Sequence, residues 1–172
     1  SAASDGYKRQ VPVLQFSDGS VIDESFDIMK WCLEQVKTDW LDINFGDQLS
    51  IIKVNDEDFK SWLNKYKYHQ RHPEQSVDFY QEKCVKILLE HEETLSNKLF
   101  LFGEKPQVAD VAIFPLVRQF AHVDLSFFTK KLPHLNRWLE TWKESKLFQS
   151  IMKKYDKWEP NQTPLIVTFN NE

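Results

Sequence analysis

The sequence contains little of the material that turns and loops require. Among its 172 residues are only 4 glycines and 7 prolines. An all-β sandwich or barrel needs a turn about every 8–12 residues, so this composition disfavours both folds. The same scarcity, together with an aromatic content of 14%, excludes a disordered or collagen-like chain. The composition therefore indicates a folded, mainly helical protein.

Cysteines and long apolar runs are scarce as well. The two cysteines, Cys32 and Cys84, form no CxxC pair and exclude a disulfide framework, so we expect a reducing, cytoplasmic compartment. Both lie on apolar helical stripes, which favours a structural role for each. The longest near-apolar run, residues 111–117, is far shorter than the ~20 residues of a membrane span. No membrane partner is expected.

The sequence also has fewer basic residues than acidic ones. The chain has 22 lysines and arginines against 26 aspartates and glutamates, which gives a net charge of −4. Proteins that bind a phosphate backbone usually carry a basic surplus. Residues 60–72 do interleave Trp62, Tyr66 and Tyr68 with basic side chains, as single-strand stacking platforms do, but the same aromatics fit a packed helix face. No nucleic-acid partner is therefore expected.

The chain does contain a short hairpin followed by a helix. Residues 11–16 predict a strand, residues 17–20 an Asp-Gly turn, and residues 21–22 the return strand. Asp23 is expected to cap the helix that follows. One face of that helix should be buried, and its members are Ile28, Met29, Cys32, Leu33 and Val36.

From residue 47 onward the hydrophobic pattern is helical. The predicted helices cover about residues 56–68, with Asp56 as cap, 76–99, 107–121, a segment beginning at Pro133, and 147–155. Gly103 is a plausible signal for the end of the second helix. The last part of the chain, residues 165–169, is β-prone and either pairs with an open sheet edge or remains coil, as termini usually do.

No motif identifies a catalytic nucleophile or a metal centre. The segment beginning at His91 starts like the HExxH zinc motif, but Leu95 stands where the second histidine should be. His69 and His72 lie close together without a cysteine or carboxylate at ligand spacing, so we expect a solvated turn and no metal. Neither a phosphate-binding glycine motif nor GxSxG is present. The catalytic residue stays unknown at this point.

The sharpest constellation is the Val11-Pro12 pair followed by Glu24-Ser25. Ser25 would lie in the first turn of a helix, where free backbone N–H groups and the helix dipole favour an anion. Glu24 offers an acceptor for a cation, so the two residues suit the zwitterion of an α-amino acid. Ordinary helix capping is the alternative interpretation of the same residues.

Several segments resemble the cytosolic glutathione transferases. VPVLQFSDGSVIDESFDIMKWCLEQ (residues 11–35) looks like the second half of their thioredoxin-like domain, with its VPVL strand, DG hairpin and Glu-Ser at the next helix start. LFGEKPQVADVAIFPLVRQF (residues 101–120) resembles the segment in which an (S/T)xAD box opens a central helix. LNKYKYHQRHP and PHLNRWLETWKES also look like parts of the helical domain.

The resemblance implies a mainly α fold in three parts. These are a partial thioredoxin-like ββα unit in residues 1–40, an all-helical C-terminal domain in residues 47–158, and a tail in residues 159–172. It also implies a homodimeric, glutathione-dependent transferase or thiol reductase whose second substrate is a small electrophile or a disulfide. The family's catalytic Tyr, Ser or Cys lies in a βαβ unit that would precede residue 1. A non-catalytic binding or scaffold protein is therefore the alternative.

The resemblance also implies roles for single residues. Pro12 matches the family's cis-proline, whose geometry presents the Val11 backbone to the cysteinyl part of glutathione. Glu24 and Ser25 match the pair that holds the γ-glutamyl end. No metal is implied, and loss of the first strand should expose apolar surface on the ββα layer.

A further match concerns the central helix. Asp110 corresponds to the structural carboxylate of the family's capping box, which implies a role in folding. Gln107 stands where the box usually has Ser or Thr, so we expect half of the reciprocal cap to be lost.

Overall fold

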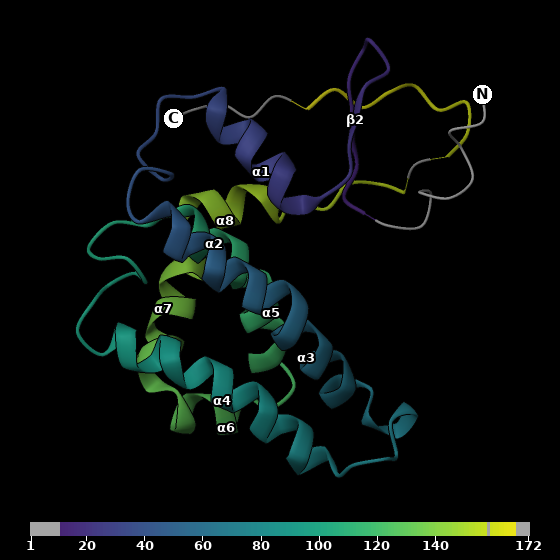
Figure 1. Ribbon diagram of the computed structural model, residues 1–172. Coiled ribbons are helices and arrows are strands. Elements are labelled where there is room, and N and C mark those ends of the chain that lie inside the picture. The colour runs from purple at the N-terminus through teal and green to yellow at the C-terminus, as the bar shows by residue number, and fades with distance from the viewer. Residues whose placement is uncertain (1–10, 158, 168–172) are drawn as a thin grey trace.

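The computed structural model describes residues 11–157 and 159–167, and it places a small hairpin beside a bundle of helices (Figure 1). The hairpin pairs β1 (Leu14–Gln15) with β2 (Val21–Ile22) in antiparallel register. The strand predicted over residues 11–16 is shorter than expected, because a two-residue partner strand provides ladder bonds for two residues alone. The predicted mainly helical fold with a partial ββα unit is confirmed.

The Asp-Gly turn between the strands forms as predicted. Gly19 has a φ of 88°, a left-handed conformation that glycine adopts without steric cost. The Asp18 carboxylate accepts hydrogen bonds from the backbone N–H of Ser20 at 2.9 Å and from its hydroxyl at 2.6 Å. The turn is thus fixed by its own side chains.

Helix α1 (Ser25–Glu34) differs from the prediction at its start and on its face. Its cap position is Glu24 and not Asp23, and the side chain of Glu24 makes no capping hydrogen bond. The predicted buried face is present only in part. Ile28, Met29 and Leu33 are half-buried, whereas Cys32 and Val36 are exposed, and no residue of α1 is fully buried. A hairpin of two short strands offers too little surface to cover a helix of this length.

The next three segments form one continuous helical rod. They are α2 (Phe45–Val54), the π-helical turn η1 (Asn55–Phe59) and α3 (Lys60–Lys67). The predicted helix start at Asp56 is therefore wrong, because the chain is already helical one element earlier. Ile52 of α2 is buried, so the apolar face of the rod extends upstream of the predicted start.

A short 3-10 turn, η2 (His69–Arg71), separates this rod from α4 (Val77–Leu95). The hydroxyl of Ser76 caps α4 by accepting the third backbone N–H at 3.1 Å. α4 ends before residue 99, where the prediction placed its end. Gly103, with a φ of 136°, closes a tight turn with Phe100 and does not end the helix.

Four helices complete the bundle: α5 (Val108–Ala121), α6 (Leu125–Lys131), α7 (Pro133–Glu144) and α8 (Lys146–Ile151). Proline takes the first position of α7 as predicted, and α8 is shorter than the predicted 147–155. Within the described residues no single helix is long and apolar enough to cross a membrane. α5 and α6 meet that criterion only as a pair bent by 120°.

The core lies around α5, which packs against α2, α3, α6 and α7 (Figure 1). Apolar stripes of α4 and α7 face this core. Their buried members are Tyr80, Cys84, Leu88, Leu95, Leu135, Trp138, Leu139 and Trp142. A smaller cluster around Ile52, Val108 and Ala109 receives Phe26 and Leu33, and this contact joins α1 to the bundle.

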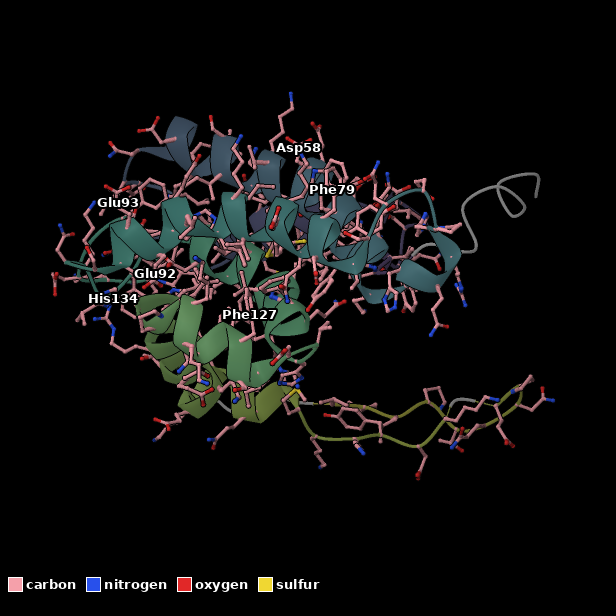
Figure 2. All side chains as sticks on the ribbon, turned by 90° about the horizontal axis from the view of Figure 1, so that it is seen from below. Asp58, Phe79, Glu92, Glu93, Phe127 and His134 are labelled. Carbon is pink, nitrogen blue, oxygen red and sulfur yellow. The ribbon has the colours of Figure 1, made fainter. Side chains whose placement is uncertain are left out.

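Side chains of α4 and α7 form hydrogen bonds with terminal backbone groups of the other helix. The Glu92 carboxylate of α4 accepts the backbone N–H groups of His134 at 3.0 Å and Leu135 at 2.7 Å, and Figure 2 shows Glu92 beside His134. In return, the Arg137 guanidinium of α7 donates to the carbonyl of Leu95 at 2.7 Å. Each bond satisfies a backbone group that a helix end leaves without a partner.

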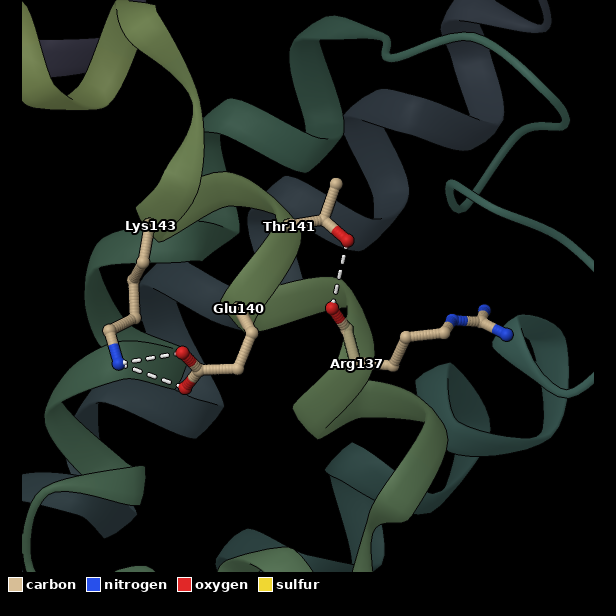
Figure 3. Close-up of polar contacts among 4 residues, drawn as sticks. All are labelled: Arg137, Glu140, Thr141 and Lys143. Atoms are coloured by element: carbon tan, nitrogen blue, oxygen red, sulfur yellow. Dashed lines mark hydrogen bonds and ion pairs between the residues drawn. The ribbon is translucent and has the colours of Figure 1, made fainter.

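Two further polar contacts of α7 join residues within the helix itself. Lys143 pairs with Glu140 at 2.8 Å, and the Thr141 hydroxyl donates to the Arg137 carbonyl at 2.9 Å (Figure 3). The Lys143–Glu140 pair joins side chains three residues apart on one helix face, so it adds roughly a few tenths of a kcal/mol.

The tail beyond α8 forms no strand within the described residues, so residues 165–167 do not pair with the hairpin. The rest of the predicted β-prone run, residues 168–169, lies outside the described residues. The alternative that the prediction left open, a terminal coil, holds for the part that is described.

Candidate functional site

The four candidate residues flank the open end of the hairpin. Val11 and Pro12 precede β1, and Glu24 and Ser25 follow β2. Leu14 lies opposite Ile22 in the antiparallel pair, so the residues that precede β1 and those that follow β2 lie at the same end of the hairpin. The Val11–Pro12 peptide bond is cis, as the resemblance implied.

The start of α1 lies at this open end. Ser25 is its first residue, and the first intrahelical bond runs from the Ile28 N–H to the Glu24 carbonyl at 3.0 Å. The backbone N–H groups of residues 25–27 therefore precede the intrahelical ladder, and Glu24 does not cap them with its side chain. Such a helix start attracts an anionic group.

All four residues are exposed to solvent. Val11 is 91% exposed, and Pro12, Glu24 and Ser25 are exposed as well. The hairpin is held to α1 by the edge-to-face contact between Phe16 and Trp31, whose ring centroids lie 5.0 Å apart. The site is therefore open on its outer side, as expected for a ββα layer with exposed apolar surface.

The two cysteines lie in opposite environments. Cys84 of α4 is fully buried, and this burial raises the pKa of its thiol to about 12, so it remains a thiol at neutral pH. Its predicted structural role agrees with this burial. Cys32 of α1 is exposed, so the prediction that it packs on a buried face is wrong. It lies two helical turns beyond Ser25.

The histidines form no metal centre in the described part of the chain, where no group of three or more ligand residues is found. His69 contacts the carbonyl of Tyr66, and His72 lies 3.4 Å from Glu74. His91 is buried in α4, and desolvation lowers the pKa of its imidazole to about 4. It is therefore neutral at physiological pH.

Asp110 is the centre of a buried polar network. Its carboxylate accepts three hydrogen bonds, from the N–H of Leu101 at 3.0 Å, the N–H of Gln107 at 2.9 Å and the indole of Trp138 at 2.9 Å. Burial raises its pKa, and the three bonds oppose that shift. The group joins α5, α7 and the loop before α5, so its role is structural.

The Gln107 side chain makes no capping hydrogen bond, and the Asp110 N–H bonds the Gln107 carbonyl at 3.1 Å, so half of the reciprocal cap is absent as expected. The other half is retained, since the Asp110 carboxylate accepts the Gln107 N–H at 2.9 Å. A residue from another helix reinforces it. The amide of Gln48 in α2 accepts the N–H of Ala109 at 3.0 Å and lies 3.5 Å from the Gln107 side chain. The sequence contained no local signal for this contact, because 61 residues separate Gln48 from Ala109.

Comparisons with known proteins agree with this architecture. Residues 74–141 match the family model described as glutathione S-transferase, C-terminal domain. No curated protein sequence matches significantly. Among solved structures, the fold is similar to that of the glutathione transferase URE2P6 from Phanerochaete chrysosporium in complex with oxidized glutathione. The two chains are 19% identical with a TM-score of 0.68, over 83% of this chain and 71% of that one.

Two further solved structures have the same fold. Glutathione transferase F7 from Populus trichocarpa is 18% identical with a TM-score of 0.66, over 83% of this chain and 73% of that one. A possible glutathione S-transferase from Rhodopseudomonas palustris is 17% identical with a TM-score of 0.68, over 88% and 71%. The chain therefore has the glutathione S-transferase fold, and its residues 74–141 match the C-terminal domain of that family.

Proposed function

We propose that the protein is a glutathione-dependent transferase or thiol reductase and that this chain carries the γ-glutamyl half of the glutathione site. The observation that carries the proposal is the open end of the hairpin, where the uncapped start of α1 lies beside an exposed carboxylate. A γ-glutamyl group is an α-amino-acid zwitterion, so it needs an anion site and a cation site next to each other.

Each residue has a distinct role in this proposal. The Ser25 hydroxyl and the free N–H groups of the first turn of α1 donate to the γ-glutamyl carboxylate. The Glu24 carboxylate accepts from the ammonium group. The backbone of Val11, at the position before Pro12, pairs with the cysteinyl backbone of glutathione. The second substrate is a small electrophile or a disulfide.

Calorimetry with glutathione tests the proposal. A charge-assisted hydrogen bond contributes about 1.5–3 kcal/mol, so Ser25→Ala should weaken binding by roughly tenfold or more. Because these residues form part of a site, affinity in this chain should be millimolar or weaker, and the comparison is best made in the longest natural form of the protein. Ser20→Ala, in the turn of the same hairpin, is the matched control. Equal affinities of wild type and Ser25→Ala would leave Ser25 as a helix-start residue only.

The second candidate is a non-catalytic binding or scaffold protein, and neither cysteine of this chain is placed to act as a nucleophile at the proposed site. Cys84 is buried with a raised pKa, and Cys32 lies two turns away from the proposed γ-glutamyl site. An assay of glutathione conjugation and of disulfide reduction decides between the two. Glutathione binding without either activity would support the scaffold.

The proposal also includes the assembly and location of the protein. We expect a two-fold homodimer, since exposed apolar surface on the ββα layer favours burial between subunits. Light scattering at micromolar concentration should give twice the mass of one chain. We also expect a cytoplasmic protein, in keeping with its two unpaired cysteines.

A further inference from the structure

A groove of about 440 Å³ lies between α4 and α6. These two helices are at the end of the bundle away from the hairpin (Figure 1). Its apolar floor consists of Val85 and Leu89 from α4 and Phe127 from α6. Val85 and Leu89 are four residues apart and therefore share a helix face. Val85 is buried, whereas Leu89 is 44% exposed, so the floor is open to solvent at one end.

The rim of this groove changes its charge along its length. Asp78 and Glu82 occupy two successive turns near the start of α4, and Lys86 follows one turn later. Lys131, in the last turn of α6, adds a second cation. Helix α6 ends just before α7 begins, and the start of α7 is bonded to Glu92 of α4. Lys131, the last residue of α6, therefore lies at the same end of the groove as Lys86. One half of the rim is acidic and the other half is basic.

The rim charges have no ion-pair partners among the described residues. Glu82 and Lys86 are four residues apart on one helix, a spacing that often gives an ion pair, and none forms here. The same spacing does give a pair between Lys30 and Glu34 at 3.9 Å. The charged groups of the rim are thus available to a partner.

We propose that this groove binds an amphipathic helix of a partner protein. The occupant places apolar side chains on Val85, Leu89 and Phe127, basic side chains over Asp78 and Glu82, and acidic side chains over Lys86 and Lys131. Both walls are helices whose backbone groups bond internally, so a β-strand would find no ladder partners here. The stretch from residue 78 to residue 89 is about 16 Å long, which corresponds to three turns of a docked helix.

Two synthetic helical peptides of equal composition are the probes. Both carry leucines at i, i+3, i+4 and i+7. One has its glutamates in the first half and its lysines in the second half, and the other interleaves them. Fluorescence anisotropy with the full chain should show about tenfold tighter binding of the segregated peptide, because several rim ion pairs add up. The double variant Glu82→Lys/Lys86→Glu interleaves the rim charges and should abolish that preference.

Leu89→Asp tests the floor, since a charge there opposes apolar burial and should weaken binding at least tenfold. Leu99→Asp is the matched control, because Leu99 is 51% exposed and lies outside the groove. The proposal is overturned if neither peptide binds at about 1 mM or if Leu89→Asp binds as the wild type does. It is also overturned if sedimentation shows a dimer that Leu89→Asp converts to monomer, because a second copy would then fill the groove.

Discussion

The helical bundle and the ββα segment differ in how far their helices bury an apolar face and in whether their helix ends are hydrogen-bonded. In the bundle, the helices bury large apolar side chains such as Trp138, and residues of neighbouring helices bond the ends of α4, α5 and α7. In the ββα segment, α1 buries no residue, and the Glu24 side chain at its cap position makes no hydrogen bond with its first turn.

This difference separates stability from binding. Polar groups in the bundle, such as Asp110 and Gln48, are fully buried and hydrogen-bonded, and they contribute to folding. At the start of α1, by contrast, exposed donors lie beside an exposed carboxylate. A ligand can bind polar groups that have no hydrogen-bond partner in the protein without breaking a contact that stabilises the fold. Substitutions in the two regions should therefore affect different measurements.

The largest effect is expected at Asp110. Asp110→Ala leaves the N–H of Leu101, the N–H of Gln107 and the indole of Trp138 without an acceptor, and we expect a loss of about 4 kcal/mol in the free energy of unfolding. Urea unfolding followed by circular dichroism measures it. The exposed Asp42→Ala is the control and should change stability by less than about 0.5 kcal/mol. Similar losses in both variants would contradict a structural role.

A pH dependence of stability should come from His91. Burial lowers the pKa of His91 from 6.5 to about 4, so the unfolded chain binds a proton between these pH values and the native chain does not. The contribution of His91 to the free energy of unfolding is therefore fully present above pH 6.5. It decreases as the pH drops towards 4, by roughly 3 kcal/mol in total.

Comparing unfolding at pH 7 and pH 4.5 isolates this contribution. The difference between the two pH values should be smaller in His91→Leu than in the wild type. The exposed His122→Leu should retain the wild-type difference. Asp110, whose pKa is raised by burial, acts in the opposite direction, since its contribution falls as the pH rises through its folded pKa. An unchanged pH dependence in His91→Leu would rule out the assignment to His91.

A smaller effect is expected where α4 holds the start of α7. Glu92→Gln removes the charge and one of the two acceptors that face the N–H groups of His134 and Leu135, and should cost about 1–2 kcal/mol. The neighbouring Glu93 is exposed and lacks these bonds, so Glu93→Gln is the matched control. If the two variants unfold alike, the carboxylate of Glu92 does not stabilise the start of α7.

The helical domain was predictable from the sequence to a large extent because its signals are local. The stripe through Leu135, Trp138 and Trp142 repeats every three or four residues, and the family match in residues 74–141 falls on the same region. Failures occurred where the partner is distant in sequence. Nothing near Glu92 indicates that it caps α7, and Asp56 resembles a cap but lies inside a continuous helical rod.

The ββα segment was predicted less accurately for a related reason. The periodicity around Cys32 indicates an amphipathic helix, but burial requires a partner surface, and a sheet of two short strands provides little. Val11, Pro12, Glu24 and Ser25 lie around the open end of the hairpin. Their binding roles stay predictions, as do the domain limits 1–40, 47–158 and 159–172.

The smallest effect on stability is expected at Ser25, and it tests the separation of stability from binding directly. Ser25 is exposed at the first position of α1, so Ser25→Ala should change the free energy of unfolding by less than about 0.5 kcal/mol. The same variant should lower glutathione affinity by roughly tenfold if the hydroxyl holds the γ-glutamyl carboxylate. Measuring both quantities on the same preparation distinguishes a ligand contact from a folding contact. A loss of stability comparable to that of Glu92→Gln would show that Ser25 supports the helix, and the proposed binding role would then have to rest on Glu24 alone.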